Sequence, residues 1–113
     1  MGKSYKAERS RAKALLRQLP SEVTYVNEAI RRAANLMIWA SANESTKNYE
    51  VARQDYATAI EALSEIGRVI SKSHAAYGTL CDIVQEETET AIEGLRSVEA
   101  KTRLAEYINI KVH

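Results

Sequence analysis

Apolar residues recur along the chain at the three- and four-residue intervals of an α-helix, and only a few polar clusters interrupt them. The first apolar segment stops before Pro20, because a proline disfavours helical geometry in the residue that precedes it. A polar run predicts a turn near residues 42–46, and residues 71–78 hold the only further candidate for a break. The pattern therefore predicts an all-α fold, a hairpin or bundle of three to four helices with long amphipathic faces, as one domain over residues 1–113.

We expect four segments within this domain. A basic amphipathic helix covers residues 1–19, a second helix covers 21–42, and one or two long helices cover 45–106. Gly78 does not decide between one long helix and two, because a glycine costs only about 1 kcal/mol relative to alanine inside a helix. Residues 107–113 alternate apolar and polar side chains, which is a strand-like pattern. We expect this segment to be an apolar tail that docks on another surface.

Apolar residues of the second helix fall on one narrow seam, which is typical of helices that pair with other helices. A helix of about 23 residues is about 35 Å long. A three-helix monomer of this size cannot completely bury both sides of helices that long. We therefore expect a homo-oligomer, by the usual symmetry of protein assemblies. The residues expected at its interface are Val26, Ile30, Met37, Trp39, Tyr56, Ile60 and Leu63.

Composition argues against several classes of protein. One cysteine, Cys81, rules out an internal disulfide framework, and with His74 it supplies only two of the ligands that a zinc site needs. No run of about 18 apolar residues predicts a membrane span, and a charged start in place of an apolar leader favours the cytoplasm. No nucleophile with a base, carboxylate pair or glycine-rich phosphate loop is evident. We expect no metal, no cofactor and no enzymatic activity.

The formal net charge of +1 hides a polarity along the chain. Residues 1–37 hold eight Lys and Arg against three acids, whereas the remainder holds eight against twelve. Such a basic segment indicates an anionic partner, because clustered Arg and Lys bind phosphates through charge-assisted hydrogen bonds and a neighbouring Tyr stacks on a base. The candidate ligand-binding residues are Lys3, Tyr5, Lys6, Arg9, Lys13, Arg17, Tyr25, Arg31 and Arg32.

A helix that ends in Leu-Pro and precedes a charged helix with a Trp-Ala-x-Ala end resembles the helical hairpin of phage cyclic-nucleotide sponge proteins. The residues that carry this resemblance are Leu19, Pro20, Glu22, Leu36, Met37, Trp39, Ala40 and Ala42. The resemblance implies a homo-oligomer that holds small cyclic nucleotides between its subunits without turnover. It thus implies an anti-defence protein that captures a cyclic oligonucleotide signal in the host cytoplasm.

Three other functions stay open. The helical faces suit an inhibitor or adaptor that binds another protein, and the basic segment also suits a nonspecific nucleic-acid binder. Five residues lie between Arg68 and His74. This pair resembles the short Arg/His motif of the all-helical HEPN ribonucleases. That resemblance implies metal-free RNA cleavage by a dimer that brings two such motifs together.

Overall fold

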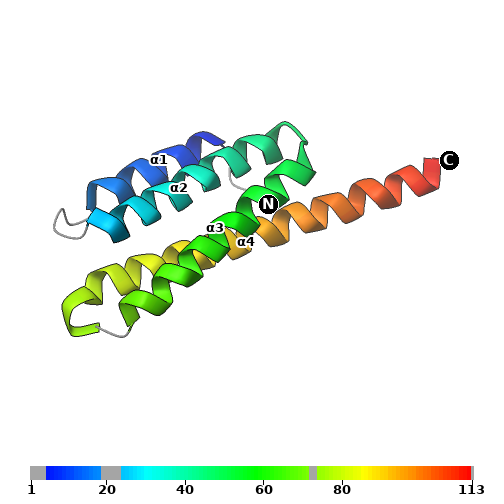
Figure 1. The fold of residues 1–113 in the computed structure, drawn as a ribbon. Coiled ribbons are helices and arrows are strands. Elements are labelled where there is room, and N and C mark those ends of the chain that lie inside the picture. Colours follow the sequence, from blue (N-terminus) through cyan, green and yellow to red (C-terminus); the bar gives the residue numbers. More distant parts are fainter. Residues whose placement is uncertain (1–4, 19–23, 72–73, 113) are drawn as a thin grey trace.

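The computed structural model describes residues 5–18, 24–71 and 74–112, and all of its regular structure is helical. Four helices follow one another: α1 (Tyr5–Gln18), α2 (Thr24–Ser45), α3 (Tyr49–Ser71) and α4 (His74–Val112). Figure 1 shows that α1 and α2 form one antiparallel hairpin and that α3 and α4 form a second. The expected all-α bundle is confirmed. The segment expected to form one or two long helices forms two, and α3 ends and α4 begins within the predicted range 71–78.

The core of the bundle lies on α3, which packs against α2 on one side and α4 on the other. Its buried residues recur every three or four positions, so they form one stripe that faces both neighbouring helices, and the opposite side of α3 is exposed. The main cluster contains Val26, Ile30, Ala33, Met37, Ala40, Ala52, Tyr56, Ala59, Leu63, Ile66, Ile70, Leu80, Ile83, Val84, Ala91 and Val98. This cluster includes the described residues of the predicted seam of α2.

This packing corrects the expected interface between copies. Val26, Ile30, Met37, Tyr56 and Leu63 are buried by the helices of this same chain and are not available to a second one. The expectation was wrong for these residues because α2, α3 and α4 of one chain pack their apolar sides against one another. Of the two remaining candidates, Ile60 is half-buried and packs against the core, and Trp39 is exposed.

The turn between α2 and α3 has a specific hydrogen-bonded geometry. Asn48 N donates to Asn43 O at 2.8 Å, and Lys47 N donates to Glu44 O at 3.1 Å. These are the two bonds of a Schellman motif, and Lys47 adopts its left-handed conformation with φ 64°. Asn48 O then accepts from Ala52 N at 3.1 Å, which begins α3. The turn lies slightly later than predicted, because residues 42–45 still belong to α2.

α4 is much longer than its partner helices and continues past the end of the bundle (Figure 1). Its 39 residues correspond to about 58 Å, against about 35 Å for the 23 residues of α3. The strand-like tail expected at residues 107–113 is helical as far as Val112, so that prediction was wrong. Alternation over three repeats is too short to outweigh the continuation of a long helix. Leu104, Tyr107 and Ile108 are exposed on this extension.

Candidate anion-binding surface

The predicted cations of α1 and α2 are all at the surface. Lys6, Arg9, Lys13 and Arg17 on α1, with Arg31 and Arg32 on α2, are exposed. None of these six forms an ion pair with another residue in the part of the chain that the structure describes. Lys3 lies outside the described residues, as do the side chains of Tyr5 and Tyr25, so their predicted roles stay predictions.

The orientation of α1 follows from its contacts with α4. Arg11 and Leu15 line a hollow of about 270 Å³ together with Glu86 and Glu87, so this side of α1 faces α4. A helix turns by about 100° per residue, which places positions 6, 9, 13 and 17 on the opposite side of its circumference. The cationic stripe of α1 therefore points away from the bundle.

α2 presents a second polar face on its outer side. Ile30, Met37 and Glu44 are buried and face the bundle, whereas Arg32 and Trp39 are exposed on the opposite side of the same helix. Arg31, which precedes Arg32 in the chain, is exposed as well. The cations of the two helices thus share the outer surface of the α1–α2 hairpin, which we call the cationic face. It is defined by Lys6, Arg9, Lys13, Arg17, Arg31 and Arg32.

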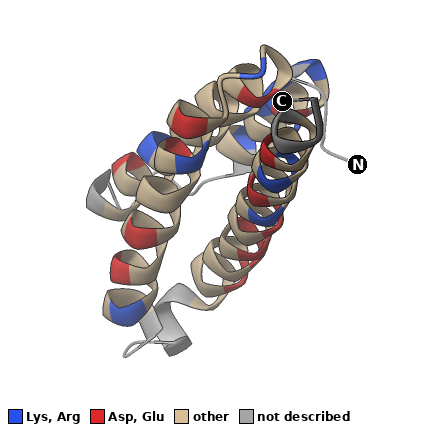
Figure 2. Ribbon diagram, turned by 90° about the vertical axis from the view of Figure 1, so that its right-hand side faces the viewer, with Lys and Arg blue, Asp and Glu red and all other residues tan. Residues whose placement is uncertain are grey.

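Acidic residues do not compensate this charge locally. Glu28 is the single exposed acid on α1 or α2 among the residues that the structure describes. The other two described acids of these helices, Glu8 and Glu44, are buried. Acids are instead frequent on α3 and α4, and Figure 2 shows them recurring along the helix that ends at the C-terminus. The charge polarity of the sequence is therefore a spatial polarity of the fold.

Arg11 is a cation of α1 that does not belong to the cationic face. Its guanidinium bridges two buried carboxylates, Glu8 of α1 and Glu87 of α4, and donates to both. Arg11 Nε lies 3.1 Å from Glu8 Oε1, and Arg11 Nη2 lies 3.0 Å from Glu87 Oε2. Burial lowers the pKa of Arg11, but hydrogen bonds and charge attraction from both carboxylates outweigh it and raise the pKa overall. This ion triad holds α1 on α4, so Arg11 is engaged within the fold.

A second buried carboxylate, Glu44, connects α2 to α3 and α4. Ser97 Oγ and Lys101 Nζ each donate to Glu44 Oε2 at 2.7 Å, and Tyr56 Oη donates to Oε1 at 3.4 Å. Burial, followed by the negative charge of Glu44, raises the pKa of the Tyr56 hydroxyl well above its ordinary value. Sequence reasoning missed this cluster because Ser97 and Lys101 are more than 50 positions away from Glu44 in the chain.

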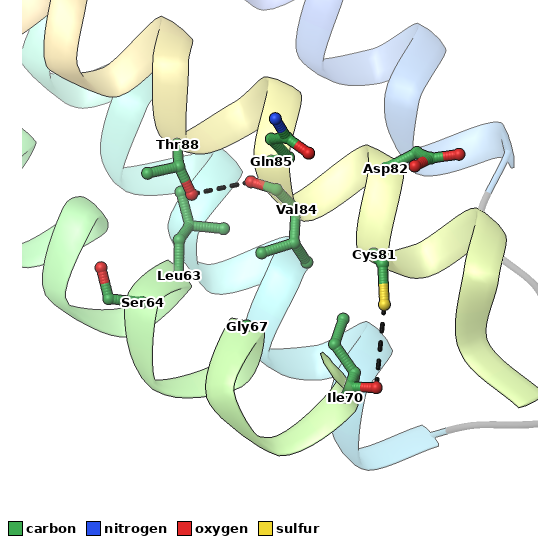
Figure 3. Close-up of a pocket in the computed structure, with 9 residues that line it drawn as sticks. All are labelled: Leu63, Ser64, Gly67, Ile70, Cys81, Asp82, Val84, Gln85 and Thr88. Carbon is green, nitrogen blue, oxygen red and sulfur yellow. Dashed lines mark hydrogen bonds between the residues drawn. The ribbon is translucent and has the colours of Figure 1, made fainter. Parts of the chain in front are cut away.

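A hollow between α3 and α4 does not coincide with the cationic face. It holds about 430 Å³ and has an apolar floor of Leu63, Ile70 and Val84 (Figure 3). Cys81 Sγ faces Ile70 O at 3.7 Å, and Thr88 donates to Val84 O at 2.7 Å within α4. The remaining lining residues are Ser64, Gly67, Asp82 and Gln85. No cation lines this hollow and Asp82 carries negative charge, so it does not suit a phosphate.

Other candidate chemistry finds little support in the described structure. Arg68 donates to Glu65 at 2.8 Å on the surface of α3, and the side chain of His74 lies outside the described part, so the Arg/His motif stays a prediction. No group of three or more His, Cys, Asp or Glu side chains that could hold a metal ion occurs in residues 5–18, 24–71 and 74–112. Within the same ranges, no helix combines the length and the apolar character needed to cross a membrane. The chain matches no protein-family model, no curated protein and no solved structure.

Proposed function

We propose that this protein captures a small phosphate-bearing ligand, most concretely a cyclic oligonucleotide, on its cationic face and sequesters it without changing it chemically. The observation that carries the proposal is the imbalance of charge on α1 and α2, where six exposed cations oppose one exposed acid among the described residues. A desolvated phosphate accepts charge-assisted hydrogen bonds from several such side chains at once. Sequestration without chemistry agrees with the sponge resemblance of the sequence.

The ion triad supports this assignment, because it engages Arg11 within the fold, whereas the six cations of the cationic face remain exposed to a ligand. Arg11 offsets part of the charge of Glu8 within the fold, on the side of α1 that faces α4 and not the cationic face. Lys101 likewise offsets part of the charge of Glu44 on α2. Fixed acids elsewhere on α3 and α4 repel a polyanion from the remaining surface. The field therefore guides an anionic ligand toward α1 and α2.

Calorimetry with a panel of cyclic di- and trinucleotides tests the proposal. We expect binding at micromolar concentration that weakens as salt is added, because exposed charges are screened. Replacing Arg9 and Lys13 by glutamine should lower affinity by at least about tenfold, since a hydrogen bond to a charged group is worth about 1.5–3 kcal/mol.

The matched control is a chain in which Arg53 and Arg68 are replaced by glutamine. These arginines are also exposed but pair with Glu50 and Glu65 on α3. The control should bind as the natural chain does. An absence of heat with every cyclic nucleotide, or an equal loss of affinity in both variants, would contradict the proposal.

A second candidate function, contact with another protein, has one observation in its favour. Leu104, Tyr107 and Ile108 are exposed on the extension of α4 and lie on adjacent positions of one helical face. Exposed apolar clusters of this kind mark protein contacts. The measurement that favours this alternative is a change in solution mass on replacing the three residues by serine, with nucleotide binding absent. The proposed homo-oligomer is tested by the same mass measurement on the natural chain.

A further inference from the structure

Among the large apolar side chains that the structure describes, Trp39 is the most exposed, with 65% of its surface accessible. It lies near the C-terminal end of α2, on the outer side of the helix, and not on the seam formed by Met37 and Ala40. The seam turns inward, so Trp39 contributes little to the core. An indole held in water is a surface that other molecules can cover.

The neighbours of Trp39 on the same helical face are polar or charged. Arg32 and Asn35 precede it by seven and four positions, which places all three on one stripe, and both are exposed. The helix rises by about 1.5 Å per residue, so Arg32 and Trp39 are separated by about 10 Å along its axis and Asn35 lies between them. Arg31 adds a second cation beside this stripe.

This composition does not suit a contact between two copies of the chain. In a parallel two-fold contact through Trp39, Arg31 and Arg32 of one copy would lie next to the same residues of the other, and like charges oppose such a contact. A single aromatic ring also supplies far less apolar area than the roughly 1,200 Å² that a stable interface buries. Charge complementarity instead favours an occupant that is both aromatic and anionic.

We propose that Trp39 is a stacking platform for a nucleobase of the bound ligand, which makes the ligand class a nucleotide and not a bare polyphosphate. This inference rests on the proposed function, because Arg31 and Arg32 would hold the phosphates of the same molecule. Stacking of a base on an aromatic side chain is worth about 1–3 kcal/mol. The Asn35 amide offers both a donor and an acceptor to the edge of that base.

Trp39 is the sole tryptophan of the chain, so selective tryptophan excitation reports on this position alone. We expect cyclic di-AMP to quench its emission and inorganic tripolyphosphate, which has no base, to leave the emission unchanged. Trp39→Ala should weaken binding of cyclic di-AMP by about 5- to 100-fold in calorimetry, and Trp39→Phe should retain part of the affinity. Tyr107→Ala, at an exposed aromatic of α4, is the matched control and should bind as the natural chain does.

The outcomes separate this inference from the proposed function. If cyclic di-AMP binds without quenching and Trp39→Ala binds equally well, the inference fails and the proposed function stands. If tripolyphosphate binds as tightly as the nucleotide, the surface recognises phosphate alone and the inference fails again. If neither compound binds the natural chain, both proposals fail. A change in solution mass on Trp39→Ala with unchanged nucleotide affinity would assign Trp39 to a contact between copies and overturn the inference.

Discussion

Replacing Gly94 by alanine should destabilise the protein, because this glycine allows α4 to approach α3 at Tyr56. A Cβ atom added at Gly94 would lie 2.9 Å from Tyr56 Cδ1 and closer still to two other ring atoms. The ring cannot move freely, since Tyr56 is buried and its hydroxyl donates to Glu44. Overpacking of this kind costs about 1–3 kcal/mol.

Two opposing contributions set the magnitude for Gly94→Ala. Alanine favours a helix over glycine by about 1 kcal/mol, which offsets part of the overpacking cost. Because three ring atoms would lie within 3 Å of the added Cβ, the overpacking cost should be in the upper part of its range, about 2–3 kcal/mol, and the free energy of unfolding should fall by about 1–2 kcal/mol. For a domain of this size the midpoint of thermal unfolding should fall by roughly 5–15 °C. Urea unfolding followed by circular dichroism measures the change.

Gly67→Ala is the matched control on α3. An added Cβ there would lie 3.6 Å from Val84 Cγ1, which is ordinary van der Waals contact. This variant should gain about 0.5–1 kcal/mol from helix propensity alone. In a background of Tyr56→Ala, the cost of Gly94→Ala should disappear, because the ring is gone. Equal stabilisation by both glycine replacements would refute the packing argument.

Four further predictions concern stability. Arg11→Met should lower the free energy of unfolding by about 3–5 kcal/mol, because it leaves two buried carboxylates without their cation, and urea unfolding measures this loss. Lys47→Gly should raise stability by about 1 kcal/mol in urea unfolding, since φ 64° suits glycine. The raised pKa of Tyr56 means that its proton is held more tightly in the folded state, so stability should fall as pH rises above about 10, and less steeply in Tyr56→Phe. Leu104→Ser should change unfolding by less than about 0.5 kcal/mol, because this side chain lies beyond the packed bundle.

The helices were predictable because their apolar spacing is a local property. The breaks near Pro20, after Ser45 and between Ser71 and His74 also have local causes, namely a proline, a polar run and a loss of periodicity. The end of α4 was not predictable in the same way. Alternation over its last residues favoured a strand, and only the length of the helix before them explains why they stay helical.

The buried charges could not be found from local pattern. Glu44 lies in a polar run that predicts a turn, yet residues of α4 far along the chain bury it and donate to it. Arg11 is one of the eight cations of residues 1–37, and the sequence does not show that it pairs with Glu87. Its absence from the stripe of Lys6, Arg9 and Lys13 was the one available indication.

The exposure of Trp39, by contrast, could have been predicted from the sequence. A large apolar residue beside Met37 and Ala40 suggests an interface, but helical geometry places position 39 on the far side of their seam. The structure confirms that geometry, with Met37 and Ala40 fully buried and Trp39 exposed. The same reasoning separates the cationic face of α1 from its packed side.

Amide chemical shifts in NMR spectra locate a bound ligand on the protein without requiring any substitution. On addition of cyclic di-AMP, we expect shifts that concentrate on the outer side of α1 and α2, from Lys6 to Arg17 and from Arg31 to Trp39. The amides that surround the hollow between α3 and α4, near Leu63 and Val84, should remain in place. Shifts confined to that hollow, or no shifts at millimolar ligand, would contradict the claim that the cationic face is the binding site.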